Sequence, residues 1–285
     1  MKKYLLSLGT LALLAFSSCG GGDAAAPAAS SELDIATPVQ NLMVAEVTAT
    51  WCGPCGQWGK GLIADVAEMY GKRSVKVSFN SSAQGDALFV QDALAFADFI
   101  NIDGYPTQAI NLKRVVQTFP ASITVLKQKV VDMAEVEAAK APEAVVGLSF
   151  VEDAAGSGEY TIKTKTKFLK DMPEGKYHVG VFIIQDNIIE AQNGASASYE
   201  HTGVFRKLAL NEDLSKTTWG TEIATTEAKA GASFEKTFKV TAPSTTGKLA
   251  WVKANMKAVA VIYKMNSAGS RPEMVINCNM VKAKL

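Results

Sequence analysis

The chain has 285 residues, of which 48% are hydrophobic, and its 29 Lys and Arg residues nearly balance its 28 Asp and Glu residues. A balance so close to zero gives no electrostatic basis for nucleic-acid binding, and the sequence has no basic run interleaved with aromatic residues. The length allows one large domain or two medium ones.

The first 18 residues have the features of a targeting segment rather than of folded structure. Lysines at positions 2 and 3 precede an uncharged apolar run from Tyr4 to Phe16. The sequence FSSC, ending at Cys19, resembles a lipobox, which implies cleavage before Cys19, lipid on its thiol and attachment to a membrane. An ordinary secretory signal or a short membrane anchor is the alternative. The Gly- and Ala-rich residues 19–32 predict a flexible tether.

An apolar run from Leu42 to Val47 predicts a buried strand, and the pentapeptide WCGPC at residues 51–55 follows it. Two intervening residues let both sulfurs lie on the first turn of the helix predicted up to Tyr70, close enough to form a small disulfide ring. Cys52 would then lie at the helix N-terminus, where unpaired N–H groups and the helix dipole stabilise a thiolate, the attacking species in disulfide exchange. The pattern predicts a dithiol redox site formed by Cys52 and Cys55.

Strands and helices alternate in the next part of the chain. Val75 to Phe79 and Pro106 to Leu112 are predicted strands, whereas Gln57 to Tyr70, Gln84 to Ile100 and Pro120 to Lys140 are predicted helices. The alternation predicts an α/β domain over residues 33–141, with helices on both sides of a central sheet.

Three features together resemble the active site of the thioredoxin superfamily. They are the WCGPC pentapeptide, Glu46 six residues before Cys52, and the sequence GYPT at residues 104–107. The resemblance covers roughly Leu33 to Lys140 and implies a thioredoxin-like fold for this part of the chain.

The resemblance also implies a role for each site residue. Cys52 would be the nucleophile and Cys55 the resolving thiol, with Glu46 as the buried acceptor of the Cys55 proton. Pro106 would be a cis-proline packed against the disulfide. The implied substrate-docking surface comprises Trp51, Gly53, Pro54 and Tyr105.

The sequence after Cys55 departs from the thioredoxin pattern. Lys60 stands where thioredoxins usually have a proline that kinks the helix. Gly56, Gly59 and Gly61 are expected to loosen this helix, since each glycine costs about 1 kcal/mol relative to alanine.

Half of a zinc site is the alternative interpretation of the cysteine pair, and it would need two more ligands. Apart from Cys19, the sequence offers only Cys278, His178 and His201, with no second closely spaced pair. This ligand count favours the redox interpretation. No metal and no cofactor beyond the redox-active disulfide is therefore expected.

The pattern changes after the Ala141-Pro142-Glu143 boundary. Six apolar or alternating runs follow, separated by turn residues: 144–151, 159–168, 177–189, 234–241, 256–265 and 273–281. Strands without intervening helices predict an all-β, antiparallel, sandwich-like domain over residues 142–285. The fold expected for the chain is thus an α/β thioredoxin-like domain followed by this β-domain.

Three features of the second half allow two interpretations each. Residues 199–210, which include Glu200 and His201, are interpreted as a structured crossover between strands. Metal binding by Glu200 and His201 is the alternative, but two adjacent residues make a poor ligand set. Cys278 falls on an apolar strand face, which predicts a buried structural thiol rather than a resolving cysteine. A basic stripe predicts a solvated strand face, with phosphate or lipid-headgroup contact as the alternative: Lys163, Lys165, Lys167 and Lys170.

The whole chain resembles the twenty-eight-kilodalton outer-membrane protein family (Omp28-like) of Bacteroidetes-type Gram-negative bacteria. The resemblance lies in the order of lipobox, tether, α/β part and β part, and in the segment from Tyr199 to Gly220. This resemblance covers most of the chain after Cys19. It implies a lipid-anchored outer-membrane protein of the cell envelope, either periplasmic or surface exposed.

Two functions follow. The favoured one is a membrane-anchored, extracytoplasmic thiol–disulfide oxidoreductase acting on thiol- or disulfide-bearing envelope proteins, with reduction slightly favoured and an unidentified electron donor. The alternative is an outer-membrane binding or adhesion lipoprotein with a thioredoxin-like scaffold and a structural Cys52–Cys55 disulfide. Retention of Glu46, Pro54 and Pro106 beside both cysteines favours the enzyme, because burial of a carboxylate costs free energy.

Overall fold

The structure, a computed structural model, describes residues 33, 35, 38–115, 122–213, 218–243 and 249–284. All of them belong to one unit of the chain, residues 31–285. The predicted targeting segment, the lipidation residue Cys19 and the tether as far as residue 32 lie outside the described residues. None of the helices in the described part of the chain is long and apolar enough to cross a membrane.

The first half of the described chain alternates between strands and helices, as predicted. Its elements are β1 (Leu42–Thr48), a π-helical turn (Cys55–Gly59), α1 (Lys60–Tyr70), a 3-10 turn (Gly71–Arg73), β2 (Ser74–Asn80), α2 (Ala93–Ile100), β3 (Thr107–Ile110), β4 (Lys113–Arg114) and α3 (Ile123–Ala138).

Strands joined by turns and a short 3-10 helix make up the described residues of the second half. Its elements are β5 (Ala144–Glu152), β6 (Glu159–Phe168), β7 (Tyr177–Gln185), β8 (Ile188–Glu190), β9 (Tyr199–His201), β10 (Val204–Leu208), β11 (Thr221–Ala224), β12 (Ser233–Thr241), a 3-10 turn (Lys253–Asn255), β13 (Met256–Met265) and β14 (Pro272–Lys282).

A mixed nine-stranded sheet connects the two halves. Its order is β14-β13-β7-β10-β2-β1-β3-β4, with β11 also paired to β7. β1 and β2 run parallel, whereas β3 is antiparallel to β1. β10, from the second half, pairs in parallel with β2 between Val204 and Ser78. The sheet that holds the cysteine motif therefore continues into the β-rich part of the chain.

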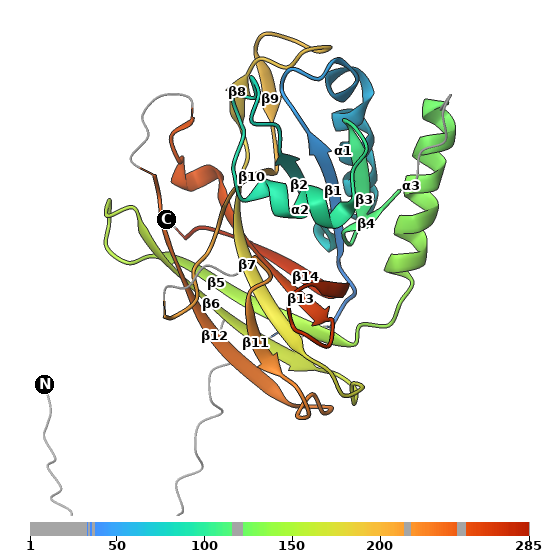
Figure 1. Ribbon diagram of the computed structural model, residues 1–285. Coiled ribbons are helices and arrows are strands. Elements are labelled where there is room, and N and C mark those ends of the chain that lie inside the picture. The colour runs from blue at the N-terminus through green and yellow to red at the C-terminus, as the bar shows by residue number, and fades with distance from the viewer. Residues whose placement is uncertain are drawn as a thin grey trace, which may run out of the picture. The chain divides into compact units, whose positions relative to one another are not determined.

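Helices cover both faces of the β1 end of this sheet. Successive side chains of β1 point to opposite faces, and all of them are buried, so each face needs a covering layer. Leu42 and Val44 pack in one buried cluster with Ile63 of α1 and Val130 of α3. Met43 faces the other way, into a cluster that contains Phe96 of α2. Figure 1 shows α1 and α3 gathered near β1 and β3.

A second sheet, with the order β12-β6-β5, covers the other end of the large sheet. Alternate residues of β6, such as Ile162, join one buried cluster with Val181 of β7 and Ala260 of β13. The two layers face each other as in a sandwich, but the larger layer is a mixed sheet that also contains β1 to β4, so the strands of residues 142–285 do not form both layers by themselves, as was predicted. Figure 1 shows β5, β6 and β12 next to β7 and β13. One layer of this sandwich is the sheet of the α/β part. The predicted boundary at residues 141/142 falls between α3 and β5.

The basic stripe of β6 lies on the side away from this core. Lys163 and Lys167 are exposed, whereas Thr164 and Thr166 between them are fully buried. Lys165 is paired with Glu235 of the neighbouring strand. This arrangement is that of a solvated strand face.

Two helices differ from their predicted bounds. The segment from Gln84 to Val90 forms turns, and α2 begins only at Ala93. The carboxylate of Asp86 accepts hydrogen bonds from Thr50 Oγ1, Asn80 Nδ2 and the Leu88 N–H, which compete with helical geometry. The third predicted helix begins at Ile123, and Pro120, its expected first-turn residue, lies outside the described residues.

Candidate active site

The cysteines of the WCGPC motif form a disulfide at the end of β1. The Cys52 and Cys55 sulfurs are 2.10 Å apart, and the Cα atoms are 5.3 Å apart. Cys52 is 2% exposed and Cys55 is fully buried. The Cys55 N–H donates to Cys52 Sγ at 3.1 Å. A backbone donor aimed at this sulfur would stabilise negative charge on it after reduction.

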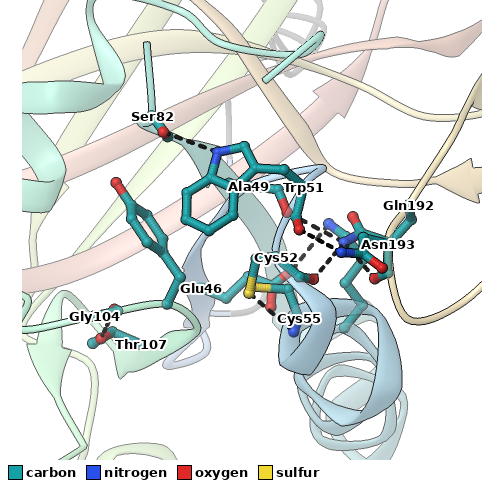
Figure 2. Close-up of a disulfide and its surroundings, with 12 residues drawn as sticks. Glu46, Ala49, Trp51, Cys52, Cys55, Ser82, Gly104, Thr107, Gln192 and Asn193 are labelled. Carbon is teal, nitrogen blue, oxygen red and sulfur yellow. Dashed lines mark hydrogen bonds and ion pairs between the residues drawn. A yellow bond between two sulfur atoms is a disulfide. The ribbon is translucent and has the colours of Figure 1, made fainter. Parts of the chain in front are cut away.

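The implied docking residues lie around this disulfide. The Trp51 side chain is exposed, contacts the Tyr105 ring edge-on with centroids 5.5 Å apart, and donates from Nε1 to Ser82 Oγ at 3.0 Å. Figure 2 shows the Trp51 ring above the disulfide. Tyr105 is hydrogen-bonded through its hydroxyl to Ser81 Oγ. Gly53 is half-buried and Pro54 is exposed.

Pro106 lies against the first turns of the helix. The Tyr105–Pro106 peptide bond is cis, as the resemblance implied. A Cβ built on Gly59 would lie 2.8 Å from Pro106 Cγ, closer than real side chains approach. Gly59 is therefore needed for the close approach of Pro106.

A buried carboxylate also lies near this glycine, with Glu46 Oε2 3.3 Å from the Cβ built on Gly59. Glu46 is fully buried, and its Oε1 atom accepts from Lys60 Nζ and from Ser78 Oγ, both at 3.3 Å. Lys60 is itself only 4% exposed. The other carboxylate oxygen, Oε2, has no hydrogen-bond partner among the described residues. Figure 2 shows Glu46 beside the disulfide.

The glycines after Cys55 differ from their expected effect. A Cβ on Gly56 would lie 2.1 Å from the Asn193 carbonyl oxygen, and Gly59 is confined by Pro106, whereas Gly61 has open space. Two of these three glycines therefore allow close packing. The chain forms a π-helical turn here, with the Lys60 N–H bonded to the Cys55 carbonyl.

A segment that the sequence analysis missed holds the active-site loop in place. Residues 191–198, here called the strap, connect β8 to β9. Gln192 Nε2 donates to the carbonyls of Ala49 at 3.2 Å and Cys52 at 3.0 Å. The Asn193 N–H donates to the Thr50 carbonyl at 2.8 Å, and Asn193 Nδ2 donates to the Trp51 carbonyl at 2.8 Å.

The strap thus provides donors to four consecutive carbonyls of the loop, and Figure 2 shows Gln192 and Asn193 beside it. Asn193-Gly194 is a common turn dipeptide, so its turn was detectable. Its partners, about 140 residues earlier in the chain, were not.

The strap also forms part of an open cavity of ≈ 380 Å³ beside the disulfide loop. Its walls come from the loop, from the turn after β2 and from the strap: Thr50, Trp51, Gly85, Ala87, Glu190, Ala191, Gln192, Asn193, Ser196 and Ala197.

Cys278 and His201 are both buried. Cys278 is a buried free cysteine, and burial raises the pKa of its thiol to about 12, as expected of a structural thiol. His201 is buried on β9 with Nε2 3.2 Å from the Glu190 carbonyl oxygen, and burial lowers its pKa to about 4. Within the described residues, no group of three or more His, Cys, Asp or Glu could hold a metal ion.

Comparisons with known proteins give a fold but no family. No protein-family model matches the chain, and no curated protein matches it. Among solved structures, HBP35 of Porphyromonas gingivalis is similar with a TM-score of 0.63 at 20% identity, over 87% of this chain and 76% of that one. A domain of the outer membrane lipoprotein Omp28 from the same organism has a TM-score of 0.32 at 16% identity, over 51% of this chain and 91% of that one.

The Omp28 similarity is too low to carry an argument. The likeness to HBP35 supports an α/β fold, and its 87% coverage of the chain extends it over both halves. The chain therefore shares its fold with HBP35 of Porphyromonas gingivalis.

Proposed function

We propose that this protein is a membrane-anchored, extracytoplasmic thiol–disulfide oxidoreductase. The observation that carries the proposal is the arrangement of three groups around one sulfur pair. A backbone N–H is aimed at Cys52 Sγ, a buried Glu46 lies on the inner side, and Pro106 packs against the turn that bears Cys55. These groups could serve thiolate formation, proton transfer and substrate alignment respectively.

The reaction proceeds in two exchanges. The Cys52 thiolate attacks a substrate disulfide, forms a mixed disulfide and releases one substrate thiolate. The Cys55 thiol then gives its proton to Glu46, and its sulfur attacks Cys52 Sγ. This step closes the Cys52–Cys55 disulfide and releases the second thiolate, so that two electrons pass from the dithiol to the substrate. A dithiol donor must reduce the site again.

The surroundings of the disulfide suit a polypeptide substrate. Trp51 and Tyr105 provide an exposed aromatic surface, and the cavity between the Trp51 loop and the strap can hold a side chain next to the substrate disulfide. We therefore expect envelope proteins with accessible disulfides as partners. The lipobox resemblance at Cys19 supports lipid attachment to a membrane of the cell envelope, for which we propose the outer membrane.

Reduction of a protein disulfide by the reduced chain tests the proposal. We expect Cys52→Ser to abolish turnover and Cys55→Ser to accumulate the mixed disulfide. Cys278→Ala is the matched control, because this buried thiol has a raised pKa and should leave turnover unchanged. Exchange that persists at the wild-type rate in Cys52→Ser would contradict the mechanism.

One observation favours the alternative, a binding lipoprotein with a structural disulfide. Cys52 is only 2% exposed, and the strap bonds the carbonyls on both sides of it. In that case mild reductant would leave the native disulfide intact. Quantification of free thiols after dithiothreitol treatment of the folded protein separates the two functions, because a redox-active pair opens before the protein unfolds.

A further inference from the structure

Lys60 forms a buried ion pair next to the disulfide, at the position where the sequence departs from the thioredoxin pattern. Its Nζ atom lies 3.3 Å from Glu46 Oε1, and the two side chains are 5% and 0% exposed. Ser78 Oγ donates to the same carboxylate oxygen. Removing two opposite charges from water costs free energy. A pair of apolar side chains in the same place often stabilises a protein at least as much as the ion pair does. Stability alone therefore gives little reason for this pair.

The pair gives different environments to the two carboxylate oxygens. Oε1 accepts from both Lys60 and Ser78, whereas Oε2 has no hydrogen-bond partner among the described residues. Oε2 is also the oxygen nearest to Gly59, 3.3 Å from a Cβ built there. The ammonium thus holds one oxygen and leaves the other facing the helical turn that begins with Cys55.

The π-helical turn connects the lysine directly to the resolving cysteine. The Lys60 N–H bonds to the Cys55 carbonyl, and the same residue supplies the ammonium to Glu46. A proline at this position would remove both groups, because it has neither an N–H nor a charge. Lys60 therefore fixes the distance between the turn and the carboxylate through one backbone bond and one side-chain bond.

We propose that Lys60 is a positioning residue that holds the Glu46 carboxylate as the proton acceptor for Cys55. This inference rests on the proposed oxidoreductase function. When the Cys55 sulfur attacks Cys52 Sγ, its proton moves to Glu46 Oε2, and Lys60 keeps its own proton throughout. The role of Lys60 is to orient the base and to offset its charge in the buried interior.

Other charged or titratable groups also face this pair. Lys76 on β2 and Tyr199 on β9 interact electrostatically with Glu46, and His201 on β9 interacts with Lys60. His201 is neutral at pH 7 because burial lowers its pKa to about 4. Lys76 has a second partner in the Thr202 hydroxyl. Of these groups, Lys60 alone is hydrogen-bonded to the carboxylate through a charged atom.

Reaction of the reduced full chain with 5,5′-dithiobis(2-nitrobenzoate) separates the two exchanges. Attack by Cys52 releases one thionitrobenzoate, and resolution by Cys55 releases the second. The protein carries Cys19→Ser and Cys278→Ala, so that only the two site thiols report. The variants are Lys60→Met, Lys60→Arg, Glu46→Gln and the double variant Glu46→Gln/Lys60→Met.

We expect Lys60→Met to slow the second release at least about tenfold, in the range of positioned acid–base groups, and to change the first less than twofold. Lys60→Arg should restore the second release to within about threefold, because it keeps the charge. The double variant should be no slower than Glu46→Gln alone, since both changes act through one carboxylate.

Three results would overturn the inference. Lys60→Met could resolve at the wild-type rate, slow both releases equally, or add its effect fully to that of Glu46→Gln. If Lys60→Met does not fold, Lys60→Arg and the double variant keep the inference falsifiable, because neither leaves a buried unpaired charge: a double variant slower than Glu46→Gln alone, or Lys60→Arg slowed well beyond threefold, would overturn it. Absence of any thionitrobenzoate release from the reduced parent protein would overturn the proposed function together with this inference.

Discussion

Gly59 shows how a single missing side chain shapes the site. A Cβ built on it would lie 2.8 Å from Pro106 Cγ and 3.3 Å from Glu46 Oε2. The sequence predicted only that glycines would weaken this helix. The contact that requires Gly59 involves Pro106, from a loop far along the chain, and a local pattern carries no information about it.

Substitution of Gly59 should therefore cost stability where a nearby glycine should not. We expect Gly59→Ala to destabilise the protein by about 1–3 kcal/mol through overpacking against Pro106. Gly61→Ala, in the same helix with no atom within 4 Å, should stabilise by up to about 1 kcal/mol. Urea unfolding of both variants measures the difference. Equal effects would mean that the helix, rather than the contact with Pro106, sets the cost.

His201 should make stability depend on pH. Burial lowers its pKa from the ordinary 6.5 to about 4, so between these values the unfolded chain binds a proton that the folded chain excludes. The free energy of unfolding should fall as pH is lowered from 6.5 to 4, by at most about 3 kcal/mol, with no contribution from His201 above this window.

Unfolding of His201→Gln at several pH values isolates this effect. Its stability should change less than that of the wild type between pH 6.5 and 4. His178→Gln is the comparison. Burial lowers the pKa of His178 as well, but this side chain is only half-buried, whereas His201 is fully buried. The same slope in His201→Gln and the wild type would show that His201 binds its proton equally well in the folded and unfolded chain.

At the scale of elements, the strap fixes the conformation of the disulfide loop. Gly194 has a φ of +82°, and a Cβ on it would lie 2.0 Å from the Gly53 carbonyl oxygen. The loop and the strap therefore pack backbone against backbone at Gly53, and again at Gly56, where a Cβ would lie 2.1 Å from the Asn193 carbonyl oxygen. Strands such as β6 and β13 were predicted with correct bounds because their alternation is local. The strap was not predicted, because its turn sequence does not reveal its partners.

Gly194→Ala and Gly231→Ala form a matched pair that tests the strap. Gly231 has a similar φ of +85° but open space around it, so alanine there should cost only the backbone strain of about 1–2 kcal/mol. Gly194→Ala should cost about 1–3 kcal/mol more, because the strap must move away from Gly53. It should also shift the reduction potential of the disulfide. Equal losses of stability and an unchanged potential would mean that the strap does not constrain the loop.

At the scale of the whole molecule, one sheet and one aromatic cluster span the predicted domain boundary. Phe79 and Phe96 come from the first half, and Phe182 and Phe205 from the second. Their ring centroids lie 4.4 to 6.2 Å apart. The sequence predicted the long strands of both halves, but residues 199–210, predicted as a crossover, contain β9 and β10, and β11 was not predicted. The pairing of β2 with β10 depends on residues more than 120 positions apart. The periodicity of the sequence carries no information about such a distant contact.

A fragment of residues 33–141 should therefore not fold alone. Without the second half, Phe79 and Phe96 lose their partners and the β2 edge is left unpaired, a combination that favours aggregation. We expect circular dichroism to show no cooperative unfolding for this fragment, whereas residues 33–285 unfold in one transition. A fragment that unfolds cooperatively with its disulfide intact would establish an independent thioredoxin-like domain.

The equilibrium reduction potential of Cys52–Cys55 in the full chain, titrated against glutathione and dithiothreitol, tests the central claim most directly. The proposed oxidoreductase predicts reversible exchange at a potential between about −270 and −120 mV, with a value near the lower limit for a reductase. A disulfide that stays closed down to about −300 mV or below would be structural, and the oxidoreductase function would be contradicted.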